Sequence, residues 1–113
     1  SPHARRRRSI SAAASATLSA GTTESVAGVA GKQISTCGFT VDGLAAGSFQ
    51  LVYGTGASCT TSTAITHVYT IGANQHITDH IAVAATSGNQ GQSLCTIVTG
   101  TSSLALTIYH TIN

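Results

Sequence analysis

Hydrophobic and polar residues alternate along most of the chain after residue 21, with the period of two that is typical of half-buried β-strands. Glycine-containing turns separate the alternating segments, and Asp42-Gly43 and Gly54-Thr-Gly56 are the strongest of these turn signals. The pattern predicts an all-β domain of about seven or eight short strands, which is typical of a β-sandwich, and we expect the jelly-roll type. The expected strands cover residues 25–30, 32–41, 48–53, 64–71, 76–85, 92–99 and 102–112.

Each expected strand has one face that would point into the core. Residues 76–85 also carry His76, Thr78 and His80 on the opposite face. The side chains expected to face the core are Cys37, Phe39, Val41, Phe49, Leu51, Tyr53, Ile65, His67, Tyr69, Ile71, Ile77, Asp79, Ile81, Val83, Ala85, Leu104, Leu106, Ile108, His110 and Ile112.

The N-terminal residues do not follow this pattern. Four arginines in an unbroken run, Arg5 to Arg8, precede a low-complexity Ser/Ala segment over residues 9–20. A segment of this composition has too little apolar surface to enter a core. We therefore divide the chain into a basic, Ser/Ala-rich N-terminal arm over residues 1–20 and a β-sandwich domain over residues 21–113, and expect the arm to be extended.

The overall composition supports an all-β domain that associates with other proteins. Only 7% of the residues are charged, so the sequence cannot build charged helix faces. A nearly uncharged Ser/Thr surface gives little protection against self-association, and we expect a defined oligomer or a particle. No apolar stretch reaches the length of about 18 residues that a membrane-spanning helix needs, so we expect no membrane contact.

The arginine run holds four of the five basic residues, while the rest of the chain has one lysine against three carboxylates. Four adjacent guanidinium groups repel one another unless an anionic surface lies beside them. That surface can be nucleic acid, because arginine binds phosphate through two hydrogen bonds, or an acidic protein surface, which offers carboxylates in the same geometry. The third interpretation is a solvated tail without a partner.

Candidate chemistry is sparse. The three cysteines lie too far apart for a zinc motif, and Cys37 is expected to be an inert core thiol. His76 and His80 would lie about 13 Å apart on one strand face, too far to share a metal ion within one chain, although copies around a threefold axis can bring such residues together. Asp79 needs a partner, such as a backbone amide or a donor from a neighbouring subunit. We therefore expect no catalytic residues, no metal and no cofactor, because Glu24, Asp42 and Asp79 form no evident acid/base pair and no phosphate-binding loop occurs.

Four segments resemble a group of small virion proteins of tailed bacteriophages. They are Val26-Ala-Gly-Val-Ala-Gly-Lys-Gln-Ile34, Phe49-Gln-Leu-Val-Tyr-Gly-Thr-Gly-Ala-Ser-Cys59, Ile71-Gly-Ala-Asn74 and Gly91-Gln-Ser-Leu-Cys95, followed by a Thr/Leu-rich final strand. The resemblance covers most of residues 24–113 and implies a β-sandwich that trimerises. It also implies a Cys59–Cys95 disulfide between the loop of residues 54–63 and the sheet.

The function expected from this resemblance is that of a capsid cement, or decoration, protein on the capsid surface of the virion. Such a homotrimer would stabilise the shell by bridging neighbouring major capsid proteins, with Arg5, Arg6, Arg7 and Arg8 as the anchor on an acidic protein surface. Nucleic acid is the second choice as the partner of these arginines. The first alternative is the tip of a tail or head fibre that binds host-surface glycan, and the second is a coat protein whose basic arm binds the genome.

Overall fold

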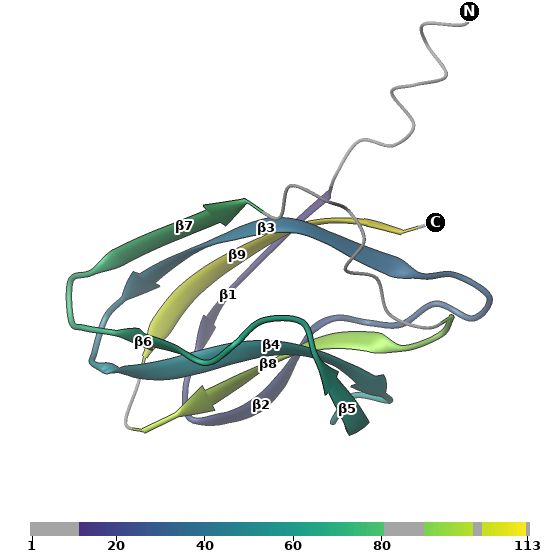
Figure 1. The fold of residues 1–113 in the computed structure, drawn as a ribbon, viewed down its shortest axis with the longest axis horizontal. Coiled ribbons are helices and arrows are strands. Elements are labelled where there is room, and N and C mark those ends of the chain that lie inside the picture. The colour runs from purple at the N-terminus through teal and green to yellow at the C-terminus, as the bar shows by residue number, and fades with distance from the viewer. Residues whose placement is uncertain (1–11, 81–89, 101–102, 113) are drawn as a thin grey trace, which may run out of the picture.

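The computed structural model describes residues 12–80, 90–100 and 103–112, and these residues form two packed antiparallel β-sheets (Figure 1). Arg5 to Arg8 lie outside the described residues, as do Ile81, Val83 and Ala85. The strands are β1 (Ala12–Leu18), β2 (Gly21–Val26), β3 (Ile34–Gly43), β4 (Gly47–Thr55), β5 (Thr60–Ala64), β6 (Tyr69–Ile71), β7 (His76–His80), β8 (Ser93–Thr99) and β9 (Leu104–Ile112).

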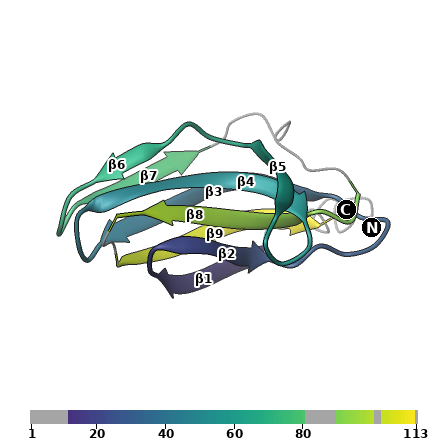
Figure 2. The same ribbon diagram turned by 90° about the horizontal axis from the view of Figure 1, so that it is seen from below.

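The strand order identifies a β-sandwich of the jelly-roll type. One sheet has the order β1-β9-β3-β7, and the other has the order β2-β8-β4-β5, with β6 also paired to β4. The first strand therefore lies beside the last one, and the second lies beside the last but one, as in a jelly roll. Figure 1 shows the two sheets as separate layers, and in Figure 2 the sheets lie one behind the other. The expected all-β sandwich is confirmed.

The core between the sheets contains most of the residues that the alternation predicted for β3, β4 and β9. Phe39 and Phe49 are 0% and 1% exposed and contact each other edge to face, with ring centroids 5.8 Å apart. Tyr69 joins them, stacking on Phe49 at 5.2 Å. Buried aliphatic side chains complete this core: Leu18, Val26, Ile34, Val41, Leu51, Ile71, Leu94, Val98, Leu104, Leu106 and Ile108.

The expectation that residues 9–20 form a linker is wrong for residues 12–18, which form β1. Seven residue pairs join β1 to β9 without a register shift, from Ala12 opposite His110 to Leu18 opposite Leu104. Leu18 is 3% exposed, and Ala14 packs against the core. Alanine has a low strand propensity, but pairing with an existing strand and burial of Leu18 outweigh it.

Two further expectations about β3 are wrong. The strand continues through Asp42 and Gly43 instead of turning there, because Gly43 pairs with Leu104 of β9. Cys37 is partly exposed instead of lying in the core, because the register against β9 shifts between Thr36 and Gly38. Such a β-bulge leaves one residue out of the in-out alternation.

The segment of residues 64–71, expected as one strand, is divided between the end of β5 and the three-residue strand β6. Ile65 and Tyr69 are partly buried against the core and Ile71 is buried, whereas His67 is exposed. The last expected core residue of β9, Ile112, is 41% exposed. The described part of the chain therefore has nine strands, more than the alternation predicted.

Candidate functional site

The described residues contain no group of three or more His, Cys, Asp or Glu side chains placed to hold a metal ion. They also contain no helix of the length and hydropathy needed to cross a membrane. The sites that remain are a disulfide-linked hairpin, a polar group on the outer face of the β1-β9-β3-β7 sheet, an aromatic cluster between the sheets, and a hollow beside Tyr109.

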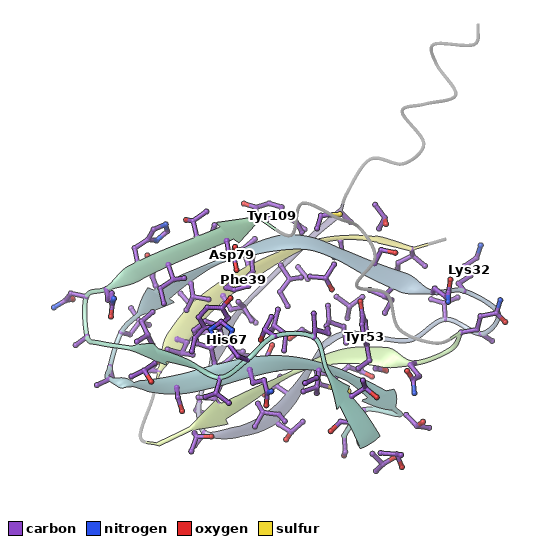
Figure 3. The ribbon with its side chains drawn as sticks, viewed as in Figure 1. Lys32, Phe39, Tyr53, His67, Asp79 and Tyr109 are labelled. Carbon is purple, nitrogen blue, oxygen red and sulfur yellow. A yellow bond between two sulfur atoms is a disulfide. The ribbon has the colours of Figure 1, made fainter. Side chains whose placement is uncertain are left out.

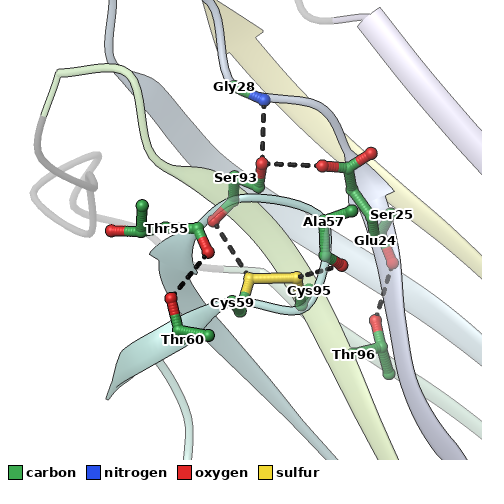
Figure 4. The surroundings of a disulfide bond; sticks show 10 residues. All are labelled: Glu24, Ser25, Gly28, Thr55, Ala57, Cys59, Thr60, Ser93, Cys95 and Thr96. Atoms are coloured by element: carbon green, nitrogen blue, oxygen red, sulfur yellow. Dashed lines mark hydrogen bonds between the residues drawn. A yellow bond between two sulfur atoms is a disulfide. The ribbon is translucent and has the colours of Figure 1, made fainter.

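Cys59 and Cys95 form the disulfide that the resemblance implied, and it links the hairpin between β4 and β5 to β8 (Figure 4). Both cysteines are buried, and Val52 and Ile97 pack around them as a second small core. The Cys59 Sγ lies 3.5 Å from the Ser93 carbonyl oxygen, and the Cys95 Sγ lies 3.8 Å from the Ala57 carbonyl oxygen. Because a disulfide sulfur carries no proton, these contacts become hydrogen bonds only when the bond is reduced.

The hairpin loop is folded tightly against its own first strand. A Cβ atom on Gly54 would lie 2.5 Å from the Cys59 Cα, so only glycine fits beneath the loop. Cys59 and Thr61 have left-handed backbone conformations, with φ angles of 50° and 54°. This conformation is unfavourable for a β-branched residue such as threonine, and the disulfide helps to hold the loop that contains it.

Next to the disulfide, Glu24 accepts a hydrogen bond from Ser93 (Figure 4). The Ser93 Oγ donates to the Glu24 Oε2 at 2.8 Å and accepts from the backbone N–H of Gly28 at 3.0 Å. The two bonds connect β2 and the loop that follows it to β8. Ser93 is 3% exposed, so this network uses both the donor and an acceptor of a buried hydroxyl group.

Asp42, His76 and Thr78 form a polar group on the outer face of the β1-β9-β3-β7 sheet. The His76 Nδ1 lies 2.6 Å from the Asp42 Oδ1, and its Nε2 lies 2.7 Å from the Thr78 Oγ1. This connectivity is that of a hydroxyl, a base and an orienting carboxylate. The same contacts follow from the sheet alone, because Asp42 lies directly opposite His76 and Thr78 is two residues farther along the same face. The His76 and Asp42 side chains are 56% and 59% exposed, so they lack the enclosed surroundings in which such a relay activates a nucleophile.

Asp79 has a hydrogen-bond partner inside the chain, Tyr69, which the sequence did not predict. The Tyr69 hydroxyl donates a hydrogen bond to the Asp79 Oδ2 at 2.7 Å and thereby joins β6 of one sheet to β7 of the other. Burial of the phenol, then its hydrogen bond to Asp79 and the charge of that carboxylate, raise the pKa of Tyr69 from 10.0 to about 12. This contact helps to close the side of the sandwich that lies away from β1 and β2.

A hollow of about 410 Å³ lies beside Tyr109, which is 41% exposed. Figure 3 shows Tyr109 and Asp79 on the same layer of the sandwich. The β-bulge at Cys37 and the absence of a side chain on Gly38 help to form this hollow, and Thr40 and Thr78 also line it. Phe39 and Tyr109 give its walls a mostly apolar character, and Asp79 is the one carboxylate that lines it.

The remaining histidines differ from one another. His67 was expected in the core or at an interface; it is exposed, and its ring lies 4.1 Å from that of Tyr69 (Figure 3). His110 is 5% exposed, as the alternation predicted, and its Nδ1 has no hydrogen-bond partner among the described residues. His76 and His80 lie at the two ends of β7, and the Asp42 partner of His76 belongs to another strand.

Sequence reasoning missed the Asp42–His76, Tyr69–Asp79 and Glu24–Ser93 contacts. Their partners lie far apart in sequence, and only the strand register brings them together. The alternation did place Asp79 on a core-facing side, which was the one available signal that it needed a partner.

Comparisons with known proteins identify no relative. No protein-family model, no curated protein and no solved structure matches this chain.

Proposed function

We propose that this chain is a capsid cement protein of a tailed bacteriophage, which forms homotrimers on the capsid surface and bridges neighbouring major capsid proteins. In this role Arg5 to Arg8 anchor each copy on an acidic surface of the shell. The observation that carries the proposal is the division of charge between the arginine run and the body, together with the contacts of the body's carboxylates.

Glu24, Asp42 and Asp79 are the only acidic residues in the chain, and each has a partner within the described residues. Lys32 is the one basic residue outside the arginine run, and Figure 3 shows it at the loop end of the sandwich. The body therefore presents neither a strongly acidic nor a strongly basic surface. Four arginines that need carboxylates or phosphates are best satisfied by another molecule.

The fold and the surface chemistry are compatible with this role. Jelly rolls occur in viral capsid and lectin domains, which supports the proposal by analogy only. A Ser/Thr/Ala-rich outer face can pack closely against a neighbour because little charge must be removed from water. The trimer and the identity of the partner rest on the sequence resemblance to phage virion proteins.

The mechanism is physical and needs no catalytic group. Each copy adds buried interface across the boundary between capsid subunits, and specific protein contacts bury about 1,200–2,000 Å². Three linked copies bind with avidity, so weak individual contacts hold together under the outward pressure of packaged DNA. Electrostatic contacts of the arginine run orient each copy on the shell and raise its rate of association with the shell.

The test is deletion of residues 1–8, together with a variant in which Arg5 to Arg8 are replaced by glutamine. Particles of the phage that encodes the chain would be purified with each variant, and occupancy measured by gel densitometry and electron cryomicroscopy. We expect both variants to be lost from the shell and the particles to release DNA at lower temperature. Lys32→Gln is the matched control, because it removes one exposed positive charge from the body and should leave occupancy unchanged.

The outcomes separate the alternatives. Full occupancy and heat resistance after the deletion would contradict the anchoring role. If this chain is absent from the shell, and particles that carry the deletion variant still bind cells through it, the result would favour a fibre tip. Reduced nucleic-acid content would favour a coat protein with a genome-binding arm. A variant with the four arginines changed to lysine keeps the positive charge but loses the two-hydrogen-bond geometry of arginine. It therefore separates the contribution of charge to shell binding from that of geometry.

A further inference from the structure

Strand β1 is an unprotected sheet edge. Within the described part of the chain it pairs with β9 alone, so the backbone N–H and C=O groups on its other side have no strand partner. Figure 2 shows β1 as the outermost strand of its layer. Its sequence, Ala12-Ala-Ala-Ser-Ala-Thr-Leu18, contains no charge and no proline. Such edges pair readily with another strand.

The other edge strands carry features that oppose pairing. β2 has a register shift between Glu24 and Val26 and contains a carboxylate. β5 has five residues, of which Thr61 has a left-handed conformation. β7 also has five residues and includes two histidines and an aspartate. β6, which pairs with β4 on the same side as β5, has only three residues. β1 is longer than each of these four strands, and its register is uninterrupted. β1 is therefore the edge in the described part of the chain that is best suited to bind a strand.

We propose that β1 pairs with β1 of a second copy of this chain, antiparallel and about a two-fold axis at Ser15. This arrangement pairs all seven residues of the strand, with Ala12 of one copy opposite Leu18 of the other. The β1-β9-β3-β7 sheet then continues across both copies as one sheet. A two-fold pair of this kind is self-complementary, because each copy contributes the same surface.

The side chains and charges favour this partner and this orientation. On the outer face, Ala13 would lie opposite Thr17, and Ser15 opposite its own copy, so small uncharged groups meet small uncharged groups. In the antiparallel arrangement the two arginine runs leave the interface from opposite ends of the paired strands. A parallel arrangement would bring eight guanidinium groups together and is opposed by their repulsion.

The pair does not depend on the proposed capsid function. It uses one sheet edge of each copy, so the rest of the surface remains available for threefold contacts. If both kinds of contact form, β1 pairs would link one trimer to the next in a continuous network. Loss of the β1 pair and loss of shell binding are distinguishable, because the pair is measured on the purified protein without particles.

The register provides the sharpest test. In the full chain with Cys37→Ser, the variant Ser15→Cys is oxidised and examined on a non-reducing gel for a band at twice the 11.3 kDa chain mass. Ser15→Cys should form this covalent dimer at least about tenfold faster than Ala13→Cys, because paired strands hold residue 15 of both copies at a high effective concentration. Combining Ala13→Cys with Thr17→Cys should restore rapid cross-linking. Ser62→Cys on the exposed edge strand β5 is the matched control and should cross-link slowly.

The second measurement is the mass in solution by analytical ultracentrifugation. Ala13→Lys combined with Thr17→Lys places charges on both sides of the interface and should lower the mass of the assembly, from dimer to monomer if the β1 pair is the sole contact and from linked trimers to single trimers if threefold contacts also form, while circular dichroism shows an intact fold. Ser62→Lys should leave the mass unchanged. Equal cross-linking rates at residues 13 and 15, or a mass that the lysine variant does not alter, would overturn the proposal.

Discussion

Reduction of the Cys59–Cys95 bond should remove a large part of the stability of this domain. The bond joins residues separated by 36 positions in the sequence. In the chain-entropy description, breaking a bond that closes a loop of this length lowers the free energy of unfolding by about 4 kcal/mol, because the unfolded chain regains the conformational freedom that the bond removed. A domain of this size has a total stability of about 5–15 kcal/mol, so the loss is a substantial fraction.

Reduction is a cleaner perturbation than substitution at this site. The two thiols keep nearly the same volume in the core formed with Val52 and Ile97. Each new thiol also finds a carbonyl oxygen within reach, that of Ser93 for Cys59 and that of Ala57 for Cys95. The loss on reduction should therefore reflect mainly the unfolded chain. Replacing both cysteines by alanine should cost more, since packing is lost as well.

The assay is urea unfolding followed by circular dichroism, with and without a phosphine reductant, and with mass spectrometry to verify the redox state. We expect the midpoint to fall and the dependence on urea to steepen, because the reduced unfolded chain exposes more surface. The melting temperature should fall by about 15–30 °C, at about 4–8 °C for each kcal/mol. Cys37→Ser is the control and should behave as the unsubstituted chain does in both states. A stability change below about 1 kcal/mol on full reduction would refute the reasoning.

Two other sites give independent predictions. Gly54→Ala should destabilise the domain by about 2 kcal/mol or more in urea unfolding, because its Cβ would meet the Cys59 backbone, whereas Gly72→Ala, with only an ordinary contact at 3.4 Å, should be tolerated. Tyr69→Phe should cost about 1–2 kcal/mol at neutral pH, because Asp79 loses its hydrogen-bond donor. Since the pKa of Tyr69 is raised from 10.0 to about 12, the unfolded chain loses this proton first, and stability should fall between these two pH values. The fall should be smaller in Tyr69→Phe, and an identical pH profile would contradict the assignment.

The alternation of side chains was sufficient to predict the fold class and most of the core. Phe39, Val41, Phe49 and Leu51 are buried as the period of two requires, because a strand between two layers has only one inward face. The same rule failed at Cys37, where a β-bulge interrupts the period. A bulge depends on the partner strand, which local sequence does not contain.

The beginning of the sandwich was missed for a similar reason. Residues 12–18 have the composition of a linker, and only pairing with β9 makes them a strand. The contacts of the candidate sites, such as Asp42 with His76 and Tyr69 with Asp79, also depend on which strands become neighbours. The Cys59–Cys95 disulfide was expected only from the resemblance proposed for the sequence, since spacing alone does not determine which of three cysteines pair.

The position of β1 beside β9 also governs when this protein can fold. Ala12 lies opposite His110, so the first described strand has no partner until β9, more than 80 residues farther along, has been synthesised. The same holds for β2, which pairs with β8. Pairings of such long range close slowly, because the entropy of a large loop is lost before any contact forms. Pairing of β1 must therefore follow synthesis of β9, and until then the uncharged segment that becomes β1 is exposed to other nascent chains.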